Sequence, residues 1–273
     1  MLYLTHTPGW PLCEFVDLLW LFRGVKAPHA KERLLPDGCM EMVINLHEDE
    51  VRIYDRNDTR KFQKLPGRAL AGAQSEFFVI DTAEQRSVIG VHFKPGGAFQ
   101  FFKLPADELQ GRLVSLDDVW GAAAADLREQ LLEAGTPRRQ FQTLENALMA
   151  RAVKRFERHP AVRFALDQFS GAERIRTVSE VSDQIGLSAR RFIEVFRSEV
   201  GLTPKLFCRI RRFQKLIHSL GAGNRVNWAN AALECGYFDQ AHFIHDFQAF
   251  SGLTPSVYLS QRTEHLNHVP LVD

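Results

Sequence analysis

The sequence lacks the features that identify a membrane protein, an exported protein or one of the common enzyme families. No run of about 18 apolar residues could span a membrane, and the amino terminus has no basic segment followed by an apolar one. A P-loop, a nucleophile elbow and a dinucleotide-binding glycine motif are also missing. We therefore expect a soluble, cytoplasmic protein that is not an enzyme, needs no cofactor and has no membrane partner.

Cysteine and clustered histidine are scarce as well. The 4 cysteines show no paired spacing, so we expect reduced thiols. They are Cys13, Cys39, Cys208 and Cys235. His47 and His92 lack the His-x-His arrangement of a metal-binding cupin. We interpret them as structural or surface histidines and expect no metal site.

Charge is nearly balanced, with a formal net charge of +1, but it is unevenly divided along the chain. Residues 1–153 contain 18 Lys and Arg against 21 Asp and Glu, whereas residues 154–273 contain 16 against 12. The second part therefore has a net charge of +4, from 16 positive minus 12 negative residues. This moderate positive charge predicts that the second part binds nucleic acid with a salt-sensitive affinity. At 273 residues and 45% hydrophobic, the chain is long enough for two folded domains.

One pattern occurs twice, 51 residues apart. The copies are GLSARRFIEVFRSEVGLTP at 186–204 and YFDQAHFIHDFQAFSGLTP at 237–255. Ser188 and Asp239 suit the N-cap of a helix, and Gly201 and Gly252 suit a left-handed C-terminal end. Shorter helices are expected before them, at 177–185 and 228–235. Each copy therefore predicts a helix-turn-helix unit whose second helix is available for a DNA major groove.

The segment AALECGYFDQAHFIHDFQAFSGLTPSVY at 231–258 matches the signature of the AraC/XylS family of transcriptional regulators, which residues 160–262 resemble. The resemblance implies a domain of two helix-turn-helix units joined by a long helix at 204–220, with double-stranded DNA as partner. That helix has an apolar stripe from Leu206 to Ile217 and basic residues opposite it.

The resemblance also implies which residues contact DNA. Base-reading positions are Arg190, Ile193, Glu194, Gln240, Ala241, His242 and His245. Arginine suits guanine, glutamine suits adenine and glutamate suits cytosine. Phosphate contacts are expected from Arg191, Arg197, Lys205, Arg209, Arg212 and Lys215.

The amino-terminal part has the pattern of a β-rich domain. Strands are expected at 40–46, 51–54, 76–81 and 87–93, separated by Pro-Asp-Gly, Pro-Gly and Pro-Gly-Gly turns. They favour a small barrel or sandwich, so the expected fold class is α+β with two domains. The stretches PDGCMEMVINL and VHFKPGGAFQFF look like the amino-terminal domain of an uncharacterised AraC subgroup, a likeness that names no ligand.

A small-molecule effector is expected to act on this domain. Its many aromatic residues favour a core over a pocket, although the mouth of a barrel is a common ligand site. The candidate ligand-binding residues are Cys39, Glu41, Phe78, His92 and Phe99.

Four regions are expected along the chain. They are a β-rich sensor domain at 1–115, a helical region at 116–158, the DNA-binding domain at 159–262 and a tail at 263–273. Within the helical region, one helix capped by Ser115 or Asp117 should run to Gly135, and a second should follow Pro137. These helices suit either a homodimer interface or a cover on the β-rich domain.

Together these patterns predict a DNA-binding transcription regulator. Each monomer should read two blocks of bases about one helical turn, roughly 34 Å, apart, and contact RNA polymerase if it activates transcription. Two alternatives remain. One is a DNA-repair protein with Cys39 as alkyl acceptor, and the other is a constitutive DNA-binding protein whose first half only dimerises.

Overall fold

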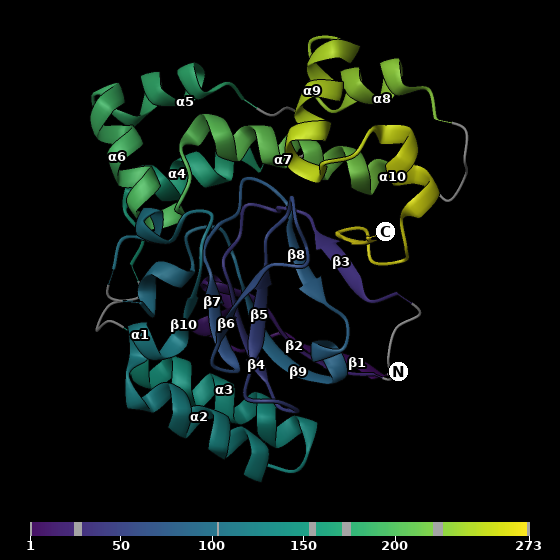
Figure 1. Ribbon diagram of the computed structural model, residues 1–273. Coiled ribbons are helices and arrows are strands. Elements are labelled where there is room, and N and C mark those ends of the chain that lie inside the picture. Colours follow the sequence, from purple (N-terminus) through teal and green to yellow (C-terminus); the bar gives the residue numbers. More distant parts are fainter. Residues whose placement is uncertain are drawn as a thin grey trace.

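The computed structural model describes residues 2–24, 29–102, 104–152, 157–170, 176–220 and 226–271. A two-sheet β-sandwich forms the middle of the molecule, and helices cover two opposite ends of it (Figure 1). The fold class is therefore α+β with a β-rich amino-terminal and a helical carboxy-terminal domain, as predicted. Within the described residues, no helix is long and apolar enough to cross a membrane.

Both sheets are antiparallel wherever their strands pair. In spatial order, the strands of the larger sheet are β1 (Leu2–His6), β2 (Val16–Arg23), β9 (Ser87–Phe93), β4 (Glu41–Asn45), β7 (Arg68–Ala71) and β10 (Leu113–Ser115). Those of the smaller sheet are β11 (His268–Pro270), β3 (Lys31–Leu34), β8 (Phe78–Asp81), β5 (Val51–Tyr54) and β6 (Phe62–Leu65).

The four strands expected from the sequence correspond to β4, β5, β8 and β9. The others were not predicted. Strand β2 carries the sequence VDLLWLFR, with apolar residues on both faces, so the alternation that identifies a strand is weak. Three other strands, β3, β6 and β7, have only four residues each. Such short segments become strands because neighbouring strands pair with them.

Aromatic side chains form much of the core beneath the larger sheet. Phe93, Phe101 and Phe102 are at most 2% exposed, and Trp120 is also buried. The rings of Phe102 and Trp120 stack with their centroids 5.4 Å apart. These aromatic residues therefore stabilise the domain, which confirms the preference for a core over a pocket at these positions.

Three helices cover the lower end of the sandwich in Figure 1: α1 (Leu116–Trp120), α2 (Ala122–Glu133) and α3 (Pro137–Arg151). The Ser115 side chain accepts a hydrogen bond from the Asp117 backbone N–H and caps α1, as expected. The prediction of one helix to Gly135 was wrong, because Gly121 adopts φ +63° and separates α1 from α2.

The helices of the carboxy-terminal domain form the opposite layer (Figure 1). They are α4 (Pro160–Phe169), α5 (Val178–Ile185), α6 (Ala189–Val200), α7 (Pro204–Ser219), α8 (Trp228–Glu234), α9 (Gln240–Ser251) and α10 (Pro255–Gln261). Ser188 caps α6 and Asp239 caps α9, while Gly201 and Gly252 end these helices in the left-handed conformation. The local signals read from the repeat are therefore confirmed.

The connecting helix α7 is more deeply buried than its apolar stripe suggested. Its buried residues include Phe207, Cys208, Ile210, Phe213, Gln214, Leu216 and Ile217. It contacts both helix-turn-helix units, and Gln214 Nε2 donates a hydrogen bond to the Pro36 carbonyl of the sandwich at 2.8 Å. The face opposite the stripe is therefore not a continuous basic surface in solvent.

The region expected as a tail is part of the fold. Strand β11 pairs with β3, and His268 Nδ1 lies 2.9 Å from Glu32 Oε2. The Tyr258 hydroxyl of α10 donates to the Leu266 carbonyl at 2.9 Å. The end of the helical domain is thus connected to the smaller sheet.

Candidate functional site

The first helix-turn-helix unit consists of α5 and α6, joined at Gly186 with φ +72°. Arg190, Arg191 and Glu194 project from α6 with side chains that are 91%, 63% and 47% exposed. Arg190 Nε donates to Glu194 Oε1 at 3.1 Å, and this bond holds the pKa of Glu194 below its usual value. Ile193 is 39% exposed. The expected base-reading residues of α6 therefore share an accessible face, where Arg190 and Glu194 pair with each other.

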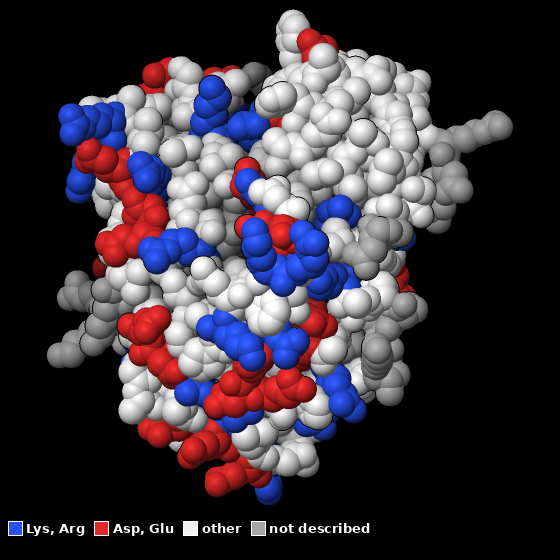
Figure 2. All heavy atoms as spheres, viewed as in Figure 1, with Lys and Arg blue, Asp and Glu red and all other residues white. Residues whose placement is uncertain are grey.

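The second unit consists of α8 and α9. Gln240, Ala241 and His245 are exposed, whereas His242 is half-buried, with its ring centroid 5.4 Å from that of Tyr237. From 226 to 261 the chain contains neither Lys nor Arg. Figure 2 shows the result as an almost uncharged surface over α8 and α9, in contrast to the mixed charges over α5 and α6.

Three of the arginines expected to contact phosphate have partners outside their own helix. Arg209 Nη2 lies 2.6 Å from Asp246 Oδ1, and Asp246 is 1% exposed. Arg212 lies over the Tyr237 ring at 5.6 Å. Arg197 Nη2 lies 3.4 Å from a carboxylate oxygen of Asp107 in the sandwich domain. The remaining candidates, Arg191, Lys205 and Lys215, are exposed.

A cavity of about 1010 Å³ lies between the sandwich and the helical domain. Asp17, Asp37, Cys39 and His92 line it from the sandwich, and α7 contributes Arg211, Gln214, Lys215 and His218. A second cavity, of about 410 Å³, shares Asp37, Cys39 and His92 with the first and is also lined by Glu41 and Phe78. Four of the five expected ligand-binding residues therefore line these cavities. The fifth, Phe99, is half-buried in the short helix η3 (Ala98–Gln100), which contacts α6, and lines neither of them.

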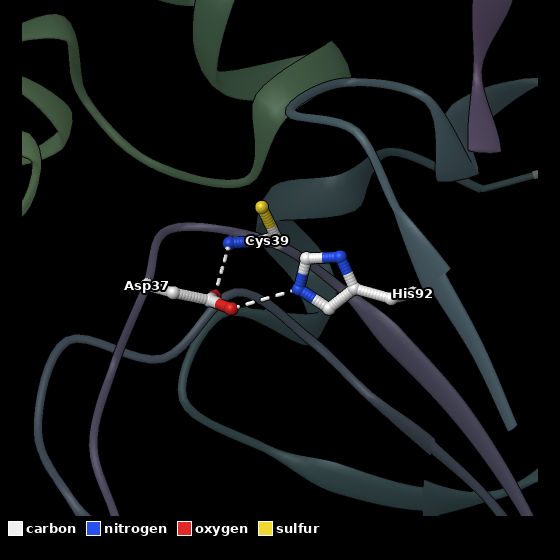
Figure 3. Close-up of side chains that lie close together, drawn as sticks. All are labelled: Asp37, Cys39 and His92. Carbon is white, nitrogen blue, oxygen red and sulfur yellow. Dashed lines mark hydrogen bonds and ion pairs between the residues drawn. The ribbon is translucent and has the colours of Figure 1, made fainter. Parts of the chain in front are cut away.

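Asp37, Cys39 and His92 form a compact group at the meeting point of the two cavities (Figure 3). The Cys39 backbone N–H donates to Asp37 Oδ1 at 2.8 Å, and His92 Nε2 lies 2.8 Å from Asp37 Oδ2. On the other side of the ring, Nδ1 is 3.6 Å from Asp17 Oδ2. Glu41 pairs with His92 across β4 and β9, and its carboxylate accepts from Trp20 Nε1 at 2.7 Å.

The electrostatics of this group follow from burial and mutual contact. Burial raises the pKa of the Cys39 thiol, and the Asp37 carboxylate raises it further. Burial lowers the pKa of His92, but Cys39, Asp17 and Asp37 outweigh it and raise that pKa well above its ordinary value. For Asp37, burial raises the pKa, but the hydrogen bond and positive charge of His92, together with backbone N–H donors, outweigh burial and lower that pKa. An imidazolium and a carboxylate therefore face each other beside a thiol.

The sequence alone did not bring these three side chains together. Asp37 and Cys39 are two residues apart in a turn, whereas His92 lies 55 residues further along than Asp37. Only the register that pairs β4 with β9 makes them neighbours. The Asp-Gly-Cys-x-Glu spacing at 37–41 was the one available signal.

The comparisons with known proteins divide the chain into the same amino-terminal and carboxy-terminal domains as the structure does. Residues 181–261 match a helix-turn-helix domain of AraC type, and residues 4–115 match a domain of unknown function, DUF6597. A search of curated proteins found no match.

Solved structures of ToxT from Vibrio cholerae are remotely similar. A ligand-free ToxT variant is 13% identical, with 90% of this chain and 97% of that chain covered and a TM-score of 0.45. For ToxT bound to an unsaturated fatty acid, the identity is 11%, the coverage 94% of each chain and the TM-score 0.46. With its two helix-turn-helix units and the match over residues 181–261, the carboxy-terminal domain is a DNA-binding helix-turn-helix domain of the AraC family.

Proposed function

We propose that the chain regulates transcription by placing α6 and α9 in two adjacent major grooves of one DNA site. The observation that carries this proposal is that the expected reading residues at the start of both helices are exposed, except for the half-buried His242. The 16-residue helix α7 lies between the two units and is about 24 Å long, which is compatible with readers one turn of DNA apart. Because the two faces differ in sequence, the site has two different halves.

Hydroxyl-radical footprinting of the full chain on a selected binding site tests this arrangement. The expected result is two protected blocks about ten base pairs apart for each monomer. A single protected block would overturn the two-groove geometry, because it would mean that only one helix reads bases.

A small-molecule effector bound in the cavity between the domains is the second part of the proposal. The cavity is bounded by the sandwich domain on one side and by α4 and α7 on the other, and α7 contacts both helix-turn-helix units. A bound molecule that favours one distance between the sandwich domain and α7 would therefore shift the positions of α6 and α9.

Thermal unfolding against a metabolite collection tests the effector. A ligand at 100 times its Kd should stabilise the protein by about 2.7 kcal/mol and also change its affinity for DNA. Stabilisation without any change in DNA affinity would support the constitutive alternative instead.

Homodimer formation and contact with RNA polymerase complete the proposal. Leu132 on α2 and Met149 on α3 are large apolar side chains that are 45% and 44% exposed, so they are the positions at which we test a contact between two copies. Sedimentation of the wild type and of a Leu132→Glu, Met149→Glu variant tests it. A monomeric wild type would overturn the dimer.

A further inference from the structure

We propose that Asp37, Cys39 and His92 bind a divalent transition-metal ion of the zinc class where the two cavities meet. The proposal goes beyond DNA binding and does not depend on it. Each of the three residues offers one ligand atom, and these atoms lie within 4.8 Å of one another. A thiolate, an imidazole and a carboxylate are the ligand types that zinc takes in proteins.

The spacing requires only small movements. A tetrahedral ion with ordinary zinc bond lengths separates its ligand atoms by roughly 3.3–3.6 Å. Asp37 Oδ2 and His92 Nε2, now 2.8 Å apart, must separate slightly, and the thiol must move inward. On binding, the thiol and the imidazolium each release a proton to solvent. The thiolate and the carboxylate then balance the two positive charges of the ion, and no electrons are transferred.

The surroundings of the group suit a metal site with one open position. Three protein ligands leave the fourth position of a tetrahedral ion for water or a ligand atom from the cavity. Asp17 Oδ2, 3.6 Å from His92 Nδ1, is placed like the outer carboxylate that orients a metal-binding histidine. That buried Nδ1 atom has no hydrogen bond within the described part of the chain.

The site also adjoins the DNA-binding domain. The Pro36-Asp37-Gly38 turn contains the metal ligand Asp37 and is followed directly by the ligand Cys39. Gln214 of α7 donates a hydrogen bond to the Pro36 carbonyl of this turn at 2.8 Å. A Cβ atom at Gly38 would lie 3.4 Å from the Phe207 ring, so the turn packs closely on α7. An ion that draws this turn toward β9 would therefore shift the contact with α7. This regulatory consequence, unlike the metal site itself, rests on the proposed function.

Cobalt titration of the untagged, metal-free full chain tests the site. We expect one Co²⁺ per chain, with visible bands of a tetrahedral ion and a thiolate-to-cobalt charge-transfer band in the near ultraviolet. Cys39→Ser should abolish the charge-transfer band. Cys13→Ser, a change at another half-buried free cysteine, should leave it unchanged. Asp17→Asn should weaken binding about 10- to 100-fold. The absence of these bands, or their persistence in Cys39→Ser, would overturn the proposal.

Thiol labelling of the wild type gives a second test that needs no variant. Zn²⁺ should slow alkylation of Cys39 by iodoacetamide at least about tenfold, because a metal-bound thiolate is shielded. The rate at Cys13, read from the same digest by mass spectrometry, should not change. Equal rates at Cys39 with and without Zn²⁺ would show that the group is only an ion pair beside a thiol.

The DNA affinity of the wild type and of Cys39→Ser, each with and without Zn²⁺, separates the site from its regulatory consequence. A Zn²⁺-dependent change of at least about threefold in the wild type alone supports coupling. Unchanged DNA affinity in a protein that demonstrably binds Co²⁺ would overturn the coupling and keep the metal site. Failure to bind any DNA would overturn the proposed function and leave the metal result intact.

Discussion

The two helix-turn-helix units share a backbone design and differ in where their charges lie. Both recognition helices begin at a short polar cap and end at a left-handed glycine followed by Leu-Thr-Pro. Arg190 and Arg191 of α6 correspond to Ala241 and His242 of α9, and the second unit has no Lys or Arg between 226 and 261. Caps and apolar contacts therefore determine the scaffold, while the exposed charges vary independently of it.

The units also differ in their buried carboxylates. Asp246 of α9 takes the place of Val195 in α6, whereas Glu199 of α6 takes the place of Phe250 in α9. Asp246 connects α9 to α7 through Arg209, and Glu199 Oε1 accepts from the His159 backbone N–H just before α4. One similar scaffold is thus attached to its surroundings by different polar contacts in each unit.

The largest expected effect comes from breaking the buried pair of the second unit. Asp246→Ala should lower the free energy of unfolding by about 2–4 kcal/mol, because it leaves the half-buried Arg209 without its carboxylate. Denaturant unfolding at equilibrium measures it. Glu194→Gln, which breaks an exposed pair of the first unit, is the matched control and should leave the transition midpoint unchanged. Equal effects of the two changes would contradict the contrast between buried and exposed charge.

The second largest effect should separate the units by sequence preference. Arg190→Ala should lose roughly 1–3 kcal/mol of discrimination at one block of bases, and Gln240→Ala should do so at the other. Binding-site selection with each variant measures this. If Arg190→Ala weakened all sequences equally, its assignment as a base reader would be wrong.

A smaller effect should show which unit provides the electrostatic attraction. Arg191→Ala should weaken binding to every sequence and reduce the slope of log affinity against log salt by about 0.9, because one phosphate contact is lost. Gln248→Ala, on the exposed face of α9, removes no charge and should leave the slope unchanged. Titrations at several salt concentrations measure both slopes. A similar loss of slope in both variants would contradict the expectation that the first unit provides more of the electrostatic attraction to DNA than the second.

The smallest effect concerns pH. Burial raises the pKa of Glu199 above its ordinary value near 4.5, so the folded state binds this proton more tightly than the unfolded state. The free energy of unfolding should therefore fall as pH rises from about 4.5 through the folded pKa. Glu199→Gln keeps the acceptor for His159 N–H and should remove this loss, with a gain of about 1 kcal/mol or less at neutral pH. Thermal unfolding between pH 4 and 8 measures it, and a variant with the wild-type pH profile would show that Glu199 does not titrate in this range.

The helical domain could be predicted well because its signals are local. Ser188, Asp239, Gly201 and Gly252 act within one or two turns of their own helix, so their spacing was sufficient. Contacts between distant segments were not visible in the same way. The sequence could not show that Arg209 would pair with Asp246, because the two residues are 37 positions apart and belong to different helices.

The sequence by itself determined the two helix-turn-helix units, the exposed first turns of their second helices and the β-rich character of the first domain, because caps, glycine stops and turns act over a few residues. Only the tertiary structure decided the rest. Strand pairing placed β2 and β11 in the sheets and brought His92 beside Asp37 and Cys39. Packing placed α7 against the turn that precedes β4 and left an open cavity between the domains. These features depend on contacts between residues far apart in the chain, and no local pattern specifies such contacts.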